Sequence, residues 1–291
     1  MLKRFLVPGL AFVLFLGWSG VGRADVVIDW NNVTLDAIRV DKTSPPKAAR
    51  ALALVQVSVF DAITSVLGPY ATHHENPQQF PGPSTLMAAT AAGAAAAHTV
   101  LVELFPSRKE TFDAALAASL AAVTDPVAKN TGESWGRLVA GQILNSREND
   151  GSAATMAYEA PTGANWWAPT PPAFAAPLLP NWPSVTLWSG LNATQFRQGP
   201  PPPSTSAEYA AAFREVRRLG RVDSQFRTPE QTQIALFWAD GPGTATPPGH
   251  WFVIAQDVSQ QQGLSLVENA RLFALLGIAV ADAAVVSWDH K

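Results

Sequence analysis

Three aspartates of the sequence lie in or near apolar helical segments, where a carboxylate needs either a polar partner or a catalytic role. Asp61 and Asp282 each interrupt an apolar helical run, "VSVFDAITSV" and "IAVADAAVV", and Asp289 follows Asp282 by seven residues on the same helical face. A buried carboxylate without a partner costs several kcal/mol, so each should meet a donor. Candidate donors are Arg50, Arg271, a tryptophan N–H or a backbone N–H. Structural pairing is the favoured interpretation, and a catalytic carboxylate pair is the alternative.

Histidine, the usual general base and metal ligand, is rare in this chain. His250 follows the glycine-rich loop "GPGTATPPG" and could line a cleft, whereas His73, His74 and Glu75 look like a fragment of a metal site. Adjacent histidines do not share a helix face and no third ligand is spaced to join them, so we interpret the pair as loop residues. His98 lies among alanines and is interpreted as a helix-contact residue. We find no phosphate-cradling loop, nucleophile elbow, zinc-protease motif or dinucleotide fingerprint, and we predict no metal site.

Residues 1–24 have the layout of a secretory signal peptide. Lys3 and Arg4 precede an apolar stretch over residues 5–18, and the small residues Gly22 and Ala24 stand where a peptidase would cleave. A membrane anchor is the alternative, but the apolar stretch contains a proline and is shorter than the roughly 20 residues that a span requires. The sequence therefore predicts export to the periplasm or the extracellular space.

The composition of residues 25–291 limits the classes of partner. Without cysteine the fold depends on its core, and a chain of this size buries roughly 70–75% of its unfolded surface. Residues 1–24 carry three basic and no acidic side chains, which leaves 17 basic and 23 acidic residues and a net charge of −6. This charge argues against nucleic acid or an anionic membrane surface as partner. Charged or proline residues interrupt the internal apolar runs, so no stable membrane span is expected.

Helical periodicity with matching caps covers most of the chain, and strand-like alternation is nearly absent. The fold class predicted is therefore all-α, a helical bundle. Prolines suited to a first turn, caps and terminal glycines predict helices over residues 44–67, 84–105, 107–123, 125–151, 205–220, 228–240, 250–262 and 265–291. The capping pairs expected are Ser107 with Glu110, Thr205 with Glu208, Thr228 with Gln231, and Ser265 with Glu268.

Residues 161–203 break the helical pattern and hold 11 of the 24 prolines and four of the ten tryptophans. A disordered linker is one interpretation. Disordered segments are poor in aromatic residues, however, and these tryptophans need a place to be buried. We therefore interpret residues 161–203, called the strap below, as an ordered extended segment packed over the helices of a single region, residues 25–291.

Several phrases of the chain resemble a known family. They are "ARALALVQVSVFDAI", "RENDG", "WWAPTPPAF", "RTPEQTQIALFWADGPGTATPPGHW" and "ENARLFALLGIAVADAAVVSWDHK". Together they resemble the secreted bacterial vanadium-dependent haloperoxidase-like proteins, whose superfamily includes the type 2 phosphatidic acid phosphatases. The resemblance extends over nearly all of residues 26–291 and implies an all-α helical fold.

The resemblance also implies an oxyanion site built from three motifs. The family places a lysine six residues before Arg-Pro, followed by Pro-Ser-Gly-His and by Ser-Arg-x-x-x-Gly-His. In similar members "WDxK" ends the helix that leads into the first motif, so Lys291 is the match to that lysine. The arginines, the Ser-Gly donors and both histidines have no counterpart in this sequence. Asp61, Asp282, Asp289 and His250 would at most be structural or supporting residues around that site.

A vanadate or phosphate site needs several fixed donors at once, because both ions pass through crowded, highly charged geometries. We therefore expect this chain to be the N-terminal portion of an exported haloperoxidase-like protein and to be inactive alone. In the complete protein, the resemblance implies vanadate as cofactor and oxidation of a halide by hydrogen peroxide. The alternatives are an acid phosphatase acting on a phosphoester, and a non-enzymatic binding or assembly module using the aromatic strap.

The last helix should also influence association. We expect it to expose apolar side chains that a C-terminal half or a second copy would cover, which predicts self-association or aggregation. The side chains expected to be exposed are Leu272, Leu275, Leu276, Val280 and Val285.

Overall fold

A computed structural model describes residues 25–74, 78–159, 163 and 167–291. The predicted signal peptide lies outside the described residues. Within them the regular structure is entirely helical, so the all-α prediction is confirmed. The elements, with η marking short 3₁₀ turns, are α1 (Val26–Val40), α2 (Pro45–Leu67), α3 (Leu86–Leu104), η1 (Pro106–Arg108), α4 (Lys109–Ala121), α5 (Pro126–Ser146), η2 (Trp182–Ser184), η3 (Ala193–Phe196), α6 (Ala207–Gly220), α7 (Pro229–Phe237), α8 (Thr246–Gln262) and α9 (Leu266–His290).

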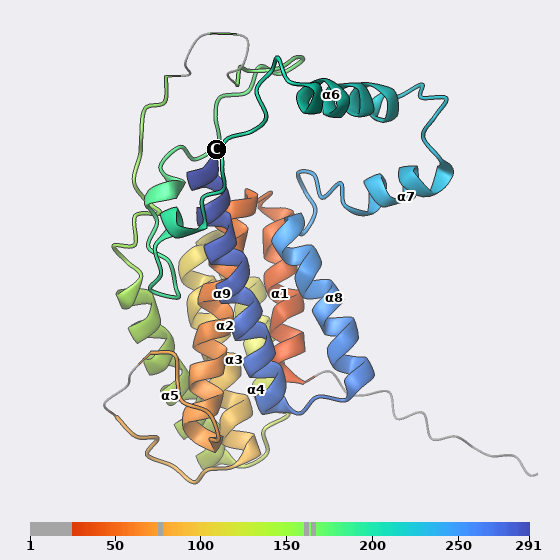
Figure 1. Cartoon of the computed structure of the whole chain (residues 1–291). Coiled ribbons are helices and arrows are strands. Elements are labelled where there is room, and N and C mark those ends of the chain that lie inside the picture. Colours follow the sequence, from red (N-terminus) through yellow and green to blue (C-terminus); the bar gives the residue numbers. More distant parts are fainter. Residues whose placement is uncertain (1–24, 75–77, 160–162, 164–166) are drawn as a thin grey trace, which may run out of the picture.

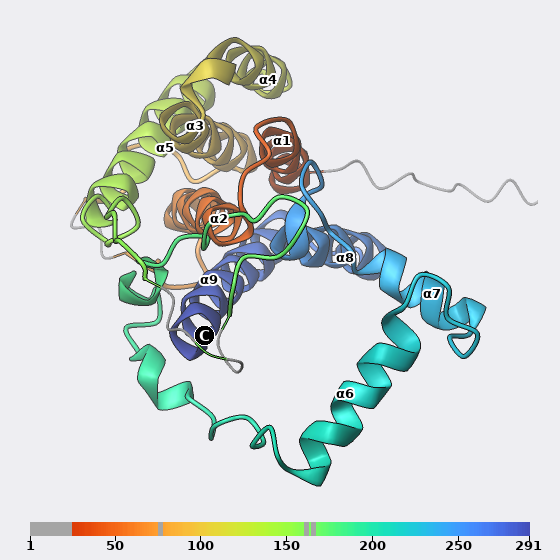
Figure 2. The same ribbon diagram turned by 90° about the horizontal axis from the view of Figure 1, so that it is seen from above.

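Helix α2 forms the axis of the bundle. Figures 1 and 2 show α3, α4 and α5 on one side of it and α8 and α9 on the other, with α1 between α3 and α8. Its side chains are apolar around nearly the whole circumference, as expected for a helix buried on all sides. The bundle is therefore a single core built around α2.

Small residues bring the main helix pairs close together. A Cβ atom added to Gly132 or Gly136 of α5 would lie 2.3 Å from the Ala88 carbonyl oxygen or 2.1 Å from the Ala92 carbonyl oxygen of α3. A Cβ on Gly277 of α9 would lie 3.0 Å from the Cα of Ala53 on α2. The backbones of these pairs are therefore in direct contact, which only glycine permits at these positions.

Helix α1 was not predicted, because its polar residues break the apolar periodicity. Asn31 and Thr34 are both buried, and Asn31 Oδ1 accepts a 2.6 Å hydrogen bond from the side-chain amide of Gln56. Asp25 caps this helix, with Oδ1 accepting the Val27 and Ile28 N–H groups at 3.0 and 3.1 Å. An aspartate directly before an apolar run was the available signal.

Two capping predictions are confirmed and two are wrong. The boxes at Thr228 and Ser265 form as expected. Ser107 instead lies inside the turn η1, and α4 begins after it without a side-chain cap. Ser206, rather than Thr205, caps α6 by accepting the Tyr209 N–H at 3.1 Å. Helix α8 begins at Thr246, four residues before the predicted start, and α5 and α7 end at Ser146 and Phe237, before their predicted ends.

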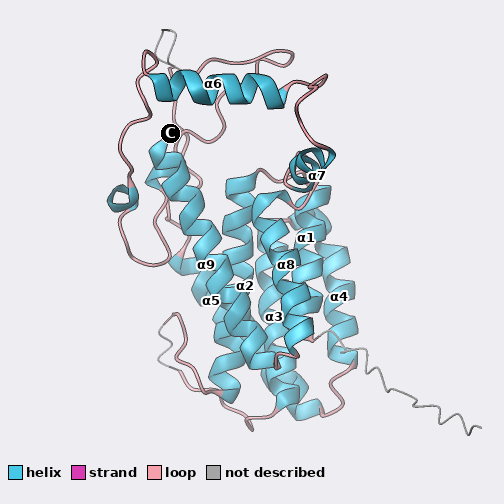
Figure 3. Ribbon diagram, turned by 45° about the vertical axis from the view of Figure 1, so that its right-hand side comes forward, coloured by secondary structure: helices cyan, strands magenta, loops and turns pink. Residues whose placement is uncertain are grey.

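The chain between the strap and α8 leaves the bundle and returns to it. Figure 3 shows α6 lying apart from the other helices, and neither α6 nor α7 contributes a buried residue. The middle of the strap does pack on the bundle: Trp182 is 1% exposed and, with Val185 and Leu187, meets Val285 of α9. Trp167 is largely exposed, whereas Trp188 is half-buried, so the three described tryptophans of the strap differ in their burial.

The exposure predicted for α9 is wrong for most of the five side chains named. Val285 is 3% exposed because the strap covers it. Leu272, Leu276 and Val280 are half-buried against the main core, and only Leu275, at 52%, is strongly exposed.

The expectation about internal apolar runs also needs correction. By length and composition alone, α2, α3 and α9 could each cross a membrane, because each contains an apolar window of 18 residues with no more than two charged side chains. In the folded chain 83% of the α2 window and 33% of the α9 window are buried within the protein.

Candidate functional site

Asp61 of α2 binds the loop that follows its own helix. The side chain is buried, and its two oxygens accept the backbone N–H groups of His73 and His74 at 2.6 and 2.9 Å. Desolvation by burial raises the pKa of Asp61, and the two backbone hydrogen bonds oppose this shift only in part. The partners of Asp61 are thus two backbone N–H groups, which were among the donors expected from the sequence. Neither Arg50 nor Arg271 binds it.

Asp282 of α9 repeats this arrangement on the strap. Its two oxygens accept the backbone N–H groups of Trp188 and Ser189 at 2.7 and 3.0 Å. In both cases one carboxylate satisfies two consecutive amides, so each aspartate fixes the path of a loop against a helix.

The two loops also touch each other. The ring centroids of His73 and Trp188 are 5.7 Å apart, and the guanidinium carbon of Arg147 lies 4.5 Å from the centroid of the Trp188 ring. Asp61 and Asp282 therefore act in one structural cluster that joins α2, the loop after it, the strap and α9.

Asp289 and Lys291 lie at the end of α9, beside the strap. Asp289 forms a forked ion pair with Arg197, with both N–O distances at 2.7 Å. The hydrogen bond from Arg197 lowers the pKa of Asp289. Asp282 and Asp289 thus have separate partners in the strap, Asp282 the backbone amides of Trp188 and Ser189 and Asp289 the side chain of Arg197.

Lys291 is exposed, and its Nζ lies 3.6 Å from the centroid of the Trp288 ring. Trp288 in turn donates its indole N–H to the Leu178 carbonyl at 2.9 Å. Together with Asp282 and Asp289, this bond makes three attachments of the last three turns of α9 to the strap region. The end of the helix that carries Lys291 is therefore held in place by irregular chain (Figure 1).

The turn "RENDG" anchors the strap to the bundle, a role that its sequence did not reveal. Arg50 of α2 donates to Asp150 at 2.7 Å and to the Arg147 carbonyl at 3.0 Å. Arg147 also donates to the carbonyl of Thr186, whose N–H binds the Asp150 carbonyl at 2.9 Å. Burial alone would raise the pKa of Asp150, but hydrogen bonds from Arg50 and Ser152 outweigh it and lower the pKa. The signal was a run of charged residues directly after an apolar helix.

His250 lies near the start of α8 and pairs with a carboxylate that the sequence reasoning missed. Its Nδ1 is 3.0 Å from Asp240 Oδ2, and both side chains are largely buried. The ring packs against Phe237 and Trp238, with centroids 4.4 and 4.9 Å away. A histidine held in this way has a fixed tautomer and orientation, as an acid–base group requires. The same contacts also close the loop between α7 and α8.

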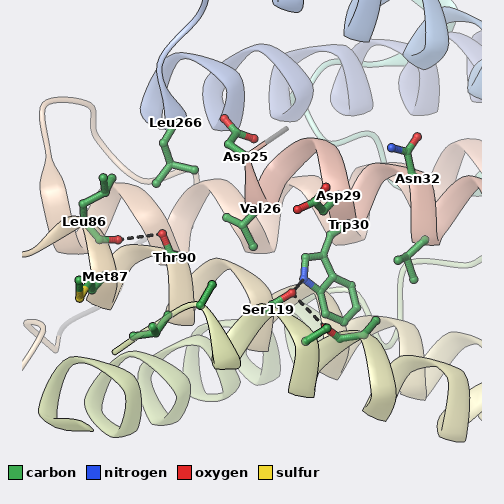
Figure 4. A pocket seen from close by; sticks show the side chains of 15 residues that line it. Asp25, Val26, Asp29, Trp30, Asn32, Leu86, Met87, Thr90, Ser119 and Leu266 are labelled. Carbon is green, nitrogen blue, oxygen red and sulfur yellow. Dashed lines mark hydrogen bonds between the residues drawn. The ribbon is translucent and has the colours of Figure 1, made fainter. Parts of the chain in front are cut away.

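A sizeable cavity lies elsewhere in the described part of the chain. It has a volume of about 740 Å³ and is lined by residues of α1, α3 and α4, with Leu266 at the start of α9 (Figure 4). Its walls are mainly apolar, and Trp30, whose indole N–H donates to Ser119 Oγ at 3.2 Å, crosses one side. None of the five candidate residues lines it, so it gives them no common site.

The residues around Lys291 do not by themselves make an oxyanion site. A single exposed ammonium stands two residues after a carboxylate, and Arg197, the arginine fixed nearby, is already paired with that carboxylate. Vanadate or phosphate would need several converging donors. In the described part of the chain there is also no group of three or more histidine, aspartate or glutamate side chains that could hold a metal ion.

Comparison with known proteins agrees with the family expected from the sequence. No family model matches the chain. The chain is similar to vanadium chloroperoxidase from Curvularia inaequalis, with 26% identity over 91% of this chain and 54% of the relative. It thus spans about half the length of the curated relative that it matches. This distant similarity, together with the all-helical fold, supports a relationship to the haloperoxidase-like superfamily.

Proposed function

We propose that the chain is the N-terminal helical part of a vanadium-dependent haloperoxidase-like protein. The observation that carries this proposal is the similarity to vanadium chloroperoxidase over 91% of the chain. The complete protein would oxidise a halide with hydrogen peroxide and use vanadate as its cofactor. The residues described here do not fit vanadate on their own, so the remaining donors would come from polypeptide outside residues 1–291.

Lys291 would be the contribution of this chain to the oxyanion site. Its ammonium is a point charge whose usefulness depends on where α9 ends, and the attachments of α9 through Asp282, Trp288 and Asp289 fix that position. These three residues would therefore be positioning residues. His250, paired with Asp240, would be a supporting residue whose fixed ring orients the loop before α8.

The uncovered apolar surface supports a large protein partner. Phe213 and Val216 of α6, Leu236 of α7, Trp251 of α8 and Leu275 of α9 are all about half exposed or more. Single exposed apolar residues are ordinary, but five large ones on the four consecutive helices α6 to α9 favour an interface. We propose that the C-terminal half of the complete protein covers them, and that the chain alone self-associates through them.

We also propose that the protein is exported. Asp25, the first residue after the expected signal peptide, is the cap of α1, so the first described helix begins directly after the expected cleavage point. N-terminal mass spectrometry of the protein recovered from the periplasm or the medium tests this proposal. A mature chain that retained residues 1–24 would contradict it.

The activity is tested by halogenation of a phenolic dye with vanadate, bromide and hydrogen peroxide. We expect no turnover from purified residues 25–291. Turnover should appear only when a polypeptide that carries the Arg-Pro, Pro-Ser-Gly-His and Ser-Arg-x-x-x-Gly-His motifs is present, and Lys291→Ala should then abolish it. Hydrolysis of p-nitrophenyl phosphate in the same mixture, without halogenation, would favour the phosphatase instead. Halogenation by residues 25–291 alone would refute the proposal that the chain is inactive.

A further inference from the structure

Helix α6 carries three arginines on one face, and a fourth follows directly after its last residue. Arg214, Arg217 and Arg218 follow the spacing i, i+3, i+4, which places them in one stripe, and Arg221 continues from the end of the helix. Helix α6 and the turn after it enclose a pocket of about 330 Å³ at this stripe, and all four arginines line it. The apolar residues of α6 lie on the opposite side of the helix.

This concentration of positive charge is largely unneutralised. Arg221 forms a forked pair with Asp223, with N–O distances of 2.9 and 2.8 Å. The guanidinium of Arg218 stacks 4.2 Å from the centroid of Phe226. Among the described residues, Arg214, Arg217 and Arg218 have no acidic side chain within ion-pair distance. Like charges three and four residues apart destabilise a helix, so the stripe has a cost that a bound anion would remove.

Stabilisation of the helix C-terminus does not explain the stripe, because a fifth arginine already has that role. Arg227 donates to the carbonyls of Leu219 and Arg221 at 2.6 and 2.7 Å, and to Thr232 Oγ1 at 3.0 Å. Ser224 donates to the Arg218 carbonyl at 2.8 Å. The free carbonyls at the negative end of the helix dipole are thus occupied by other donors, and the guanidinium groups of Arg214, Arg217 and Arg218 remain without an acidic partner.

The turn that closes the pocket is fixed by its own hydrogen bonds. Ser224 Oγ accepts the backbone N–H groups of Phe226 and Arg227 at 3.2 and 3.0 Å. This places Phe226 against Arg218 and holds the far wall of the pocket without help from the bundle. The arginines therefore face a wall of defined shape.

We propose that this pocket binds a multiply charged phosphate-type anion. Four arginines and one aspartate line the pocket, which leaves an excess of three positive charges and favours an ion with several negative charges. Guanidinium groups also match phosphate oxygens in forked geometry. The pocket is large enough for a diphosphate or a phosphate-bearing headgroup. The site shares no residue with the end of α9 and does not depend on the haloperoxidase-like function.

Isothermal titration of residues 25–291 with inorganic pyrophosphate tests the proposal. We expect binding that weakens as salt is raised, and a Kd increased about tenfold per arginine removed, so about 100-fold in the double variant R214Q/R217Q. The variant R214K/R217K should lose less, because it keeps the charge and loses only the fork. Arg137→Gln, an exposed arginine on α5, is the matched control and should bind like the unchanged protein.

Two arms separate a soluble anion from a lipid headgroup. Sedimentation with vesicles of phosphatidylcholine, with and without phosphatidylglycerol, is measured on the same variants. Pyrophosphate binding that depends on Arg214 and Arg217 identifies a soluble ligand. Binding restricted to the phosphatidylglycerol vesicles, with the same dependence, identifies a headgroup. Absence of binding in both arms, or equal affinity in the unchanged protein and in R214Q/R217Q with circular dichroism unchanged, overturns the proposal.

Discussion

The attachment of the strap to α9 can be tested through Asp282→Asn. Asparagine keeps the shape of the side chain but offers one acceptor oxygen in place of two, and it places an amide N–H against one of the two backbone N–H groups now bound at 2.7 and 3.0 Å. Hydrogen bonds to charged groups contribute about 1.5–3 kcal/mol. One such bond is lost and the other becomes neutral, while the amide at Ser189 lies near solvent. We therefore expect docking of the strap to weaken by about 2 kcal/mol.

Hydrogen exchange measured by mass spectrometry should detect this change locally. A loss of about 2 kcal/mol raises the population of the opened strap roughly 30-fold. The amides of Trp188 and Ser189 should exchange faster by that factor, whereas amides in α2 and α3 should keep their protection. The matched control is Asp257→Asn on the exposed face of α8, which should leave the exchange of the strap unchanged. A change below about threefold at Trp188, or an equal loss of protection throughout α2, would refute the reasoning.

Three further predictions concern the core, the pH dependence and Lys291. Gly136→Ala should lower the free energy of unfolding by about 3 kcal/mol, because the added Cβ would meet a backbone carbonyl of α3. Gly141→Ala on the same helix has open space around it and should raise the free energy of unfolding by up to about 1 kcal/mol. Urea titration measures both changes. Asp150 has a lowered pKa in the folded state, so its contribution to stability is present above about pH 4 and is lost as the pH falls further. Asp150→Asn should therefore reduce the loss of stability that the unchanged protein shows below about pH 4. An equal loss of stability at low pH in both proteins would contradict this. Lys291→Ala should change the free energy of unfolding by less than about 1 kcal/mol, because an exposed cation–π contact is weak, and a larger loss in urea titration would give Lys291 a structural role.

The sequence predicted the helices best where local signals decide the structure. The proline and glycine that bound α2, and the boxes at Thr228 and Ser265, act within a few residues and appear as expected. At Ser107 the same pattern failed, because Pro106 starts a 3₁₀ turn that includes the serine. Helix α1 was missed because polar residues interrupt its buried face: Asn31 accepts a hydrogen bond from Gln56 of α2 and Thr34 donates to the Trp30 carbonyl of its own helix, and no local pattern records the contact with α2.

The candidate site was predictable in its residues and not in its partners. Periodicity shows that Asp61 and Asp282 lie in apolar runs, so a donor is required. It cannot show which donor is present, because the amides that bind them belong to loops 12 and 94 residues away along the chain. Asp240, the partner of His250, was equally hidden, since the intervening loop brings the two together.

The arrangement of Asp61 and Asp282 explains why an irregular strap can serve as a structural part of a helical protein. Proline-rich chain has few N–H groups to pair, so it cannot form a ladder with a neighbour. It can still be fixed if a few carboxylates on rigid helices bind consecutive amides, and Asp282 supplies such a point on α9. Asp61 supplies the same kind of point for the loop after α2, and the rings of His73 and Trp188 bring the two fixed segments into contact. Side-chain contacts therefore connect the end of α9 to α2, the central helix of the bundle, in addition to direct helix packing. The position of Lys291 depends on those contacts.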